Sequence, residues 1–227
     1  MELISATDIG VRRKENQDNY WSARLDVMGR EVGVVCVCDG MGGLNDGGLA
    51  SRTVVQAVRE FFKTSMDTDS LVRVIKEANK SVYEKGAKSG KRMGTTCTIL
   101  ICDSGKFKIL HIGDSRCYLI KGTKLHVLTT DHSVIKQYNI TKESNPDMYR
   151  KHRNSLTRCI GVKPDVEVDV IEGEYQKGDK FLLCSDGFWH FFDSRGKVDD
   201  LDDLKSIIGE CIENGETDNI TVGVLKV

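Results

Sequence analysis

The chain has 227 residues, of which 39% are hydrophobic and 30% are charged, a composition typical of a globular protein and not of a disordered or fibrous one. Its 33 basic and 34 acidic residues leave a net charge of -1, so no global electrostatic field recruits nucleic acid or an anionic membrane. No stretch approaches the roughly 20 apolar residues that cross a bilayer. We also expect no signal peptide, because residues 1–11 alternate between apolar and polar side chains.

Two strands are predicted early in the chain, at 3–7 and 32–38. The second strand is apolar on both faces, as central strands are. Asp39 follows it directly and begins a glycine-rich run that ends at Gly43. Because glycine tolerates positive φ angles, this run predicts a tight turn.

Apolar residues at helical spacing then predict two amphipathic helices, over 54–62 and 71–82. Asp69 and Ser70 are the candidate N-caps of the second helix, since both side chains can accept a hydrogen bond from a free backbone N–H.

The second half of the chain consists mainly of predicted strands separated by short turns. The polar stretch 131–158 predicts a short helix and a surface loop, and a further helix is expected over 201–212. The predicted strands of this half are 95–102, 106–112, 116–121, 124–128, 166–171, 180–184 and 220–227.

Runs of strands with helices grouped between them predict an α+β fold with antiparallel sheets. No internal repeat and no low-complexity linker divides the sequence. We therefore expect a single domain that spans residues 1–227.

Eight cysteines occur, and most lie inside apolar runs. Cys36 and Cys38 are two residues apart, which places both thiols on one face of a strand. Buried, reduced thiols and a cytoplasmic protein are the favoured interpretation, and a soft-metal site is the alternative.

Aspartates stand where the predicted buried strands begin or end, namely Asp39, Asp114, Asp186 and Asp218. Any one of them alone is best explained as a turn former. Four together favour a different interpretation, because converging carboxylates repel one another unless a cation lies between them. An all-oxygen ligand set indicates Mg²⁺ or Mn²⁺ rather than zinc.

Short motifs around these aspartates resemble those of the metal-dependent protein phosphatase 2C family, in its compact bacterial form. They occur in the family's order and extend over nearly the whole chain. The motifs are T-D-I-G-x-x-R-x-x-N-Q-D (7–18), D-G-M-G-G (39–43), G-T-T (94–96), I-G-D-S-R (112–116), D-H-S (131–133), N-x-L-T-R-x-I-G (154–161), L-L-C-S-D-G (182–187) and D-N-I-T (218–221).

The resemblance implies two packed antiparallel sheets flanked by helices, in an α-β-β-α sandwich with a metal cluster at one edge. Asp39 is expected to bridge two metal ions, and the carbonyl of Gly40 to complete one coordination shell. Asp186 and Asp218 are expected to bind the other ion. Asp114 resembles the residue that holds a weaker third ion in bacterial members.

Two further residues take expected roles from the resemblance. Asp18 would act through metal-bound water. Arg13 matches the arginine that grips the substrate phosphate, since a guanidinium suits a phosphoryl group; the alternative is a surface charge in the basic run 12–14. Attack on phosphorus would be direct, with no phosphoenzyme.

Other residues have plainer interpretations. His111 and His132 are expected to be structural rather than catalytic. The aromatic residues at 188, 189, 191 and 192 are expected in the core, and Cys184 lacks a nearby base that would activate it.

The chain also departs from the family at several positions. Met41 stands where many members have a histidine proposed as general acid, and a methionine side chain cannot donate a proton. Leu44 and Gly47-Gly48 replace residues that bacterial members often carry at the cleft rim.

The sequence therefore predicts an enzyme that hydrolyses phosphoserine and phosphothreonine in proteins, with Mn²⁺ or Mg²⁺ at two tight sites and a weaker third. Its expected partners are phosphorylated protein substrates of a kinase, with no nucleic acid and no membrane, and we expect a monomer. The alternatives are a pseudophosphatase that serves as a binding module, and a metal-dependent hydrolase of small phosphate esters.

Overall fold

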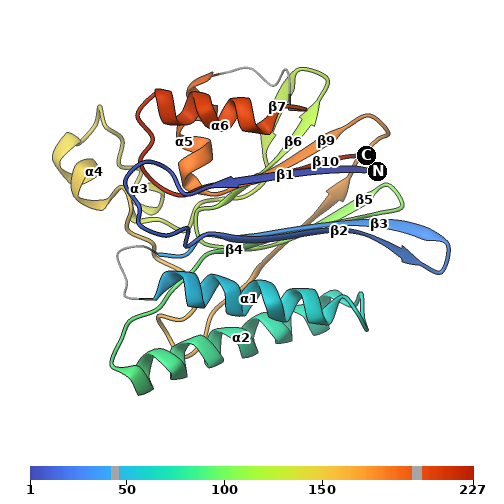
Figure 1. Ribbon diagram of the computed structural model, residues 1–227, viewed down its shortest axis with the longest axis horizontal. Coiled ribbons are helices and arrows are strands. Elements are labelled where there is room, and N and C mark those ends of the chain that lie inside the picture. The colour runs from blue at the N-terminus through green and yellow to red at the C-terminus, as the bar shows by residue number, and fades with distance from the viewer. Residues whose placement is uncertain (42–45, 196–200) are drawn as a thin grey trace.

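The computed structural model describes residues 1–41, 46–195 and 201–227. Two antiparallel sheets pack face to face, and helices cover the outer face of each (Figure 1). This confirms the predicted α+β sandwich. The first sheet contains, in spatial order, β1 (Glu2–Asp8), β10 (Ile220–Lys226), β9 (Lys180–Cys184), β6 (Arg116–Lys121) and β7 (Lys124–Val127).

The second sheet and the helices complete the layers. Helices α1 and α2 lie outside the second sheet, while α5 and α6 lie outside the first (Figure 1). The second sheet contains β2 (Asn19–Val27), β3 (Arg30–Cys38), β4 (Cys97–Asp103), β5 (Lys106–Ile112) and β8 (Asp169–Glu174). The helices are α1 (Gly47–Phe61), α2 (Thr68–Ser89), α3 (Val134–Gln137), α4 (Pro146–His152), α5 (Asp186–Arg195) and α6 (Leu204–Glu213).

Strand β3 shows how the sequence builds these layers. Val35 and Val37 pack between the two sheets, whereas Val34, Cys36 and Cys38 face the helices. Successive side chains of a strand point to opposite faces, so an apolar residue at every position makes a strand that is buried on both sides. The expectation that residues 32–38 form a central strand is confirmed.

Strand β2 and helix α5 were not expected, and the stretch 131–158 contains two short helices, α3 and α4, where one was expected. Strand β2 is an edge strand with half-buried and exposed residues, so its sequence lacks a clear apolar pattern. Helix α5 is rich in aromatic residues, which are weak helix formers in isolation. Its helical state depends on packing, because Phe188 and Phe192 are buried against the first sheet.

The expected cap of α2 was wrong. Helix α2 begins at Thr68, and its N-cap is Asp67, whose carboxylate accepts a hydrogen bond of 2.8 Å from the backbone N–H of Ser70. Asp69 and Ser70 therefore lie inside the first turn. The apolar periodicity begins only at Leu71, after a polar first turn, which explains the shift.

Candidate metal centre

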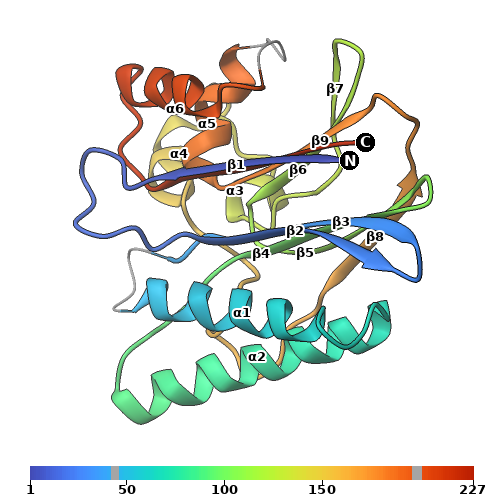
Figure 2. The same ribbon diagram turned by 45° about the vertical axis from the view of Figure 1, so that its right-hand side comes forward.

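The strand register gathers the predicted acids at one end of the sandwich. Asp39 follows β3, and Asp18 precedes its neighbour β2. Asp186 follows β9, and Asp218 precedes β10, which pairs with β9 in antiparallel register. The hairpin turns and both chain termini lie at the opposite end (Figure 2).

Asp114 joins the two sheets at this same end. It lies in the connection between β5 of the second sheet and β6 of the first, after Gly113 at a φ of 110°. A side chain at Gly113 would collide with Thr96, because a Cβ atom there would lie 2.6 Å from the Thr96 methyl carbon. The tight crossing therefore requires glycine and brings Asp114 to the seam between the sheets.

Asp18 is a buried acid that lies beside two others of the group, Asp186 and Asp218. Its side chain is buried, and neither carboxylate oxygen has a hydrogen-bond partner among the described residues. Burial raises the pKa of Asp18 to about 7, and the charges of Asp186 and Asp218 add to the rise. Since buried carboxylates are normally paired, the two oxygens make Asp18 a candidate for contact with a ligand.

The neighbouring carboxylates raise one another's pKa values. Burial raises the pKa of Asp39 well above its ordinary value, and Asp18 and Asp186 raise it further. Burial likewise raises the pKa of Asp114 to about 8, with a contribution from Asp186. Burial also raises the pKa of Asp186. This concentration of negative charge favours bound cations.

Asp218 is the acid with a clear cationic partner. Arg13 donates from Nε to one of its oxygens at 2.8 Å and from Nη2 to the other at 2.5 Å. The structure thus places Arg13 at the acidic cluster and not in a free surface run. A carboxylate has about four lone-pair positions, so Asp218 can hold Arg13 and still ligate an ion.

Threonines of the G-T-T motif fix the backbone of Asp39. Its N–H donates to Thr96 Oγ1 at 2.8 Å, and its carbonyl accepts from Thr95 Oγ1 at 2.8 Å. Gly40 follows in close contact with the N-terminal loop, because a Cβ atom there would lie 2.3 Å from the carbonyl oxygen of Gln17. The motif therefore holds the Asp39 carboxylate and the Gly40 carbonyl in fixed positions.

Asn219 ties the N-terminal loop to the cluster. It accepts a hydrogen bond of 2.9 Å from the Gln17 N–H, and its Nδ2 donates to the Ile9 carbonyl at 2.8 Å. Gly10 approaches so closely that a Cβ atom would lie 2.1 Å from the carbonyl oxygen of Asp218. These contacts position the loop that carries Arg13 and Asp18.

The interpretation of His111 and His132 as structural residues is confirmed by their contacts. His132 Nδ1 accepts from the Gly113 N–H at 3.0 Å, and its Nε2 lies 3.0 Å from Asp169 Oδ2. His111 is fully buried and satisfied by Thr98 Oγ1 at 3.0 Å and the Thr130 carbonyl at 3.1 Å.

Helix α5 supplies two residues near the acids that sequence reasoning missed. His190 lies one helical turn after Asp186, and its Nδ1 is 3.3 Å from Glu216 Oε2. Although burial opposes it, this contact raises the pKa of His190, as does the charge of Asp186. Trp189 is half-buried, and its Nε1 donates to the Asp114 carbonyl at 2.9 Å. The i, i+4 spacing from Asp186 is the signal that would have found His190.

The structure describes three of the four positions at which we noted a departure from the family pattern, Met41, Gly47 and Gly48. The Met41 N–H donates to the Gly94 carbonyl at 3.0 Å. Gly47 packs against the turn, because a Cβ atom there would lie 2.8 Å from the carbonyl carbon of Gly40, whereas a Cβ atom at Gly48 would make an ordinary contact of 3.6 Å with the Gln17 Cα. Leu44 lies outside the described residues.

The donor set fits hard divalent ions. All the converging side chains are carboxylates, and Mg²⁺ and Mn²⁺ prefer oxygen ligands. In the described part of the chain, the sulfurs of Cys36, Cys38 and Cys97 are the only three His, Cys, Asp or Glu ligand atoms that all lie within 4.8 Å of one another. No three ligand atoms of the acids, among the residues that the structure describes, all lie within 4.8 Å of one another.

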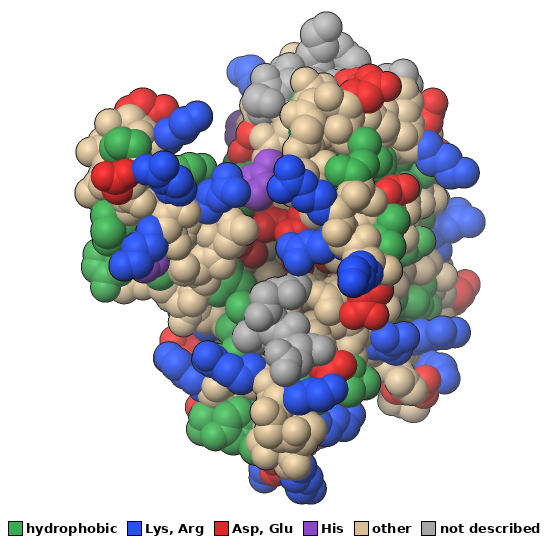
Figure 3. Space-filling model, turned by 60° about the vertical axis from the view of Figure 1, so that its left-hand side comes forward, with side chains coloured by type: hydrophobic (Ala, Val, Ile, Leu, Met, Phe, Trp, Pro, Cys, Tyr) green, Lys and Arg blue, Asp and Glu red, His purple; other side chains and the backbone are tan. Residues whose placement is uncertain are grey.

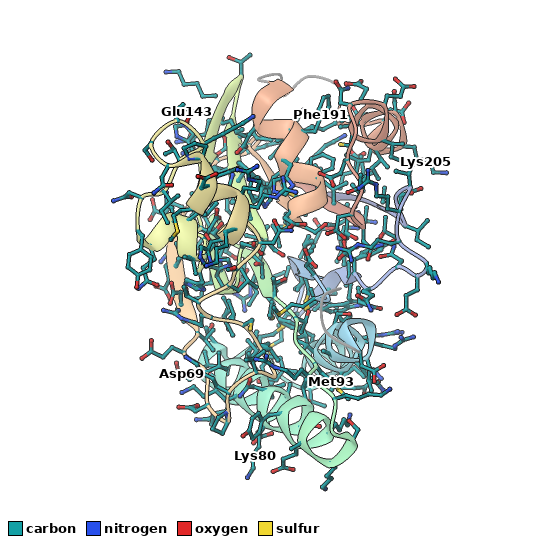
Figure 4. All side chains as sticks on the ribbon, turned by 90° about the vertical axis from the view of Figure 1, so that its left-hand side faces the viewer. Asp69, Lys80, Met93, Glu143, Phe191 and Lys205 are labelled. Carbon is teal, nitrogen blue, oxygen red and sulfur yellow. The ribbon has the colours of Figure 1, made fainter. Side chains whose placement is uncertain are left out.

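The surface above the acids is hollowed. Figure 3 shows acidic side chains at the bottom of a depression with Lys and Arg side chains around it. In an end-on view, oxygen-tipped side chains gather in the middle, with Phe191 above and Met93 below (Figure 4). Basic groups around an acidic floor can attract an anionic substrate to bound cations.

Comparison with known proteins gives the family. The chain is 30% identical over 244 residues to the protein phosphatase PhpP of Streptococcus pneumoniae, covering 100% of this chain and 98% of that protein. It is 32% identical to the serine/threonine phosphatase Stp of Listeria welshimeri, covering 95% of this chain and 92% of that protein. The solved serine/threonine phosphatase of S. agalactiae superposes with a TM-score of 0.86 at 28% identity, covering 100% of this chain and 99% of that one. A family model described as protein phosphatase 2C matches residues 11–220, and the chain belongs to this family of metal-dependent phosphatases.

Proposed function

We propose that this protein removes phosphate from serine and threonine residues of proteins, at a centre of two divalent ions with a weaker third. The observation that carries the proposal is the convergence of Asp39, Asp114, Asp186 and Asp218 around the unpartnered carboxylate of Asp18. The donor chemistry supports Mn²⁺ or Mg²⁺.

Each acid takes a distinct role in this proposal. Asp39, which lies beside the other acids, would be the ligand shared by two ions, and the Gly40 carbonyl would be a further ligand. Asp186 and Asp218 would hold the second ion. Asp114, which lies at the seam between the sheets, would hold the third, and its carbonyl accepts a hydrogen bond from Trp189.

Bound divalent ions would lower the pKa of water and neutralise charge that develops on the phosphoryl oxygens. The residues of the chain position the substrate and the reacting water. Asp18, whose pKa burial raises in the metal-free protein, would accept a hydrogen bond from water at the centre and orient it. Arg13 uses two of its five N–H donors on Asp218, so other donors can bind a substrate phosphate.

We further propose that the phosphatase domain comprises residues 1–227 and acts as a cytoplasmic monomer on the phosphoprotein products of a kinase. The match over residues 11–220 supports the extent of the domain. All eight cysteines are free, which agrees with a reducing compartment. Among the described residues, no helix is both long and apolar enough to cross a membrane.

The test is the turnover of a phosphothreonine peptide by protein stripped with a chelator and then supplied with Mn²⁺ or Mg²⁺. We expect activity only after metal is added. Full activity in the stripped protein would contradict the proposal, and a preference for small aryl phosphates with no peptide turnover would favour the hydrolase of small esters.

A further inference from the structure

A second cluster of possible metal ligands, made of three thiols, lies next to the cluster of carboxylates. Cys36 and Cys38 are on β3, and Cys97 begins the neighbouring strand β4. All three side chains are at most 1% exposed and face the layer between the second sheet and the helices α1 and α2. Their sulfur atoms all lie within 4.8 Å of one another.

The strand geometry holds the three sulfurs in place. The i, i+2 spacing points Cys36 and Cys38 to the same face of β3. Val37 pairs with Thr98 in the β3–β4 register, so the next position of each strand sets Cys38 opposite Cys97. A rigid pair of central strands thus presents three thiols to one point.

The spacing fits a trigonal metal site. With metal–sulfur distances of about 2.3 Å, the sulfurs of a planar three-coordinate site lie about 4.0 Å apart. The Sγ atoms of Cys36 and Cys38 are 3.9 Å apart. A disulfide needs a separation of about 2.05 Å and side chains that point toward each other, which two thiols side by side on one strand do not offer.

The number of sulfur ligands and their chemical softness indicate which metal ion the thiols would bind. A structural zinc site takes four ligands, and this group contains three in the described part of the chain. Soft thiolate ligands favour Cu(I). We propose that Cys36, Cys38 and Cys97 form a three-coordinate site for Cu(I), separate from the carboxylate centre. Each thiol that binds the ion releases its proton to water, and copper stays in the Cu(I) state.

The thiol site lies near the end of the strand pair, because β3 ends at Cys38 and β4 begins at Cys97. It also adjoins the phosphatase site, because Cys38 precedes Asp39, and Cys97 follows Thr96, whose Oγ1 accepts from the Asp39 N–H. An ion at the thiols would therefore shift the proposed bridging carboxylate and lower turnover.

The experiment is an anaerobic titration of the full chain, loaded with Mn²⁺, using Cu(I) in competition with a coloured Cu(I) chelator. X-ray absorption then gives the ligands of the bound copper. We expect one Cu(I) per chain with three sulfur neighbours at about 2.3 Å. The variants Cys36→Ala and Cys97→Ala should bind about 100-fold more weakly or worse.

Cys102→Ala is the matched control, because Cys102 is buried on the same strand β4 but faces the other sheet. It should bind Cu(I) as the unaltered protein does. Equal affinity in Cys97→Ala, or copper with two sulfurs or with oxygen neighbours in the unaltered protein, would overturn the proposal. So would a Cys38–Cys97 disulfide found by mass spectrometry in place of free thiols. The absorption result on the unaltered protein decides the matter even if a variant fails to fold.

Discussion

The two ends of the sandwich use aspartate in opposite ways. At the hairpin end, Asp26 accepts a hydrogen bond of 2.9 Å from the Gly29 N–H, and Asp103 pairs with Arg30 at 3.0 Å. These are exposed contacts that stabilise turns. At the other end, Asp18 and Asp114 are buried with raised pKa values of about 7 and 8, which burial causes.

The comparison teaches that position at a strand end does not define the role of an aspartate. Turn formation explains Asp26 and Asp103 completely, because a surface carboxylate is solvated and paired at little cost. It cannot explain Asp18, whose buried oxygens have no hydrogen-bond partner among the described residues. Burial without a partner, together with like charges nearby, marks a cation site.

The difference between the two ends is tested most strongly by replacing one aspartate at each end with asparagine, which removes its charge. Asp39→Asn should lower turnover of a phosphothreonine peptide by about 10³-fold or more, because it removes the ligand that we propose two ions share. Asp103→Asn should leave the rate unchanged. Initial rates at saturating Mn²⁺ measure both, and equal rates for the two variants would refute the distinction.

Within the acidic end, Asp114 should behave differently from Asp39. Asp114→Ala should lower turnover by about 10- to 100-fold, because it affects the third ion alone. Calorimetric titration with Mn²⁺ should show that tight binding persists in Asp114→Ala and is lost in Asp39→Asn. Equal loss of tight binding in both variants would contradict the division of roles.

The raised pKa of Asp114 predicts a pH dependence of stability in metal-free protein. Folded Asp114 keeps its proton up to a pH of about 8, whereas the unfolded chain loses it near its ordinary value of 3.8. The folded state therefore binds more protons in this interval, and the free energy of unfolding falls as the pH rises.

Urea denaturation between pH 6 and pH 8 can isolate this effect by comparison with Asp114→Asn. The unaltered protein should lose about 2 kcal/mol more than the variant over this range. Subtraction cancels the titration of groups that do not interact with Asp114, whereas His190, whose pKa the charge of Asp114 raises, contributes to the difference. Parallel stability curves would mean that Asp114 is already ionised in the folded state.

The smallest expected effect concerns the scaffold of the acidic end. Asn219→Ala removes the hydrogen bonds to Gln17 and Ile9 and should destabilise the protein by about 2 kcal/mol. Asn214→Ala is the control, because its side chain donates a single exposed bond to Glu210 of its own helix. Thermal unfolding should show a larger loss of stability in Asn219→Ala than in Asn214→Ala. An equal, small loss in both variants would mean that Asn219 does not hold the acidic end in place.

Much of the site could be predicted because short motifs carry it. The apolar run 32–38 fixes a central strand, and Asp39 at its end then has a defined place. The hydrogen bonds of Asn219 and Trp189 could not be predicted, since they depend on contacts across the fold. The spacing between Asp186 and His190 indicates a shared helix face only once α5 is known to be a helix. Helix α5 itself was missed because packing of aromatic residues, and not local propensity, makes it helical.

The most direct measurement of the central claim is the anomalous scattering of manganese in crystals grown with Mn²⁺. We predict two strong peaks beside the Asp39 carboxylate, one shared with Asp186 and Asp218, and a weaker third peak next to Asp114. Absence of any peak among these carboxylates, or a single peak that does not touch Asp39, would contradict the account.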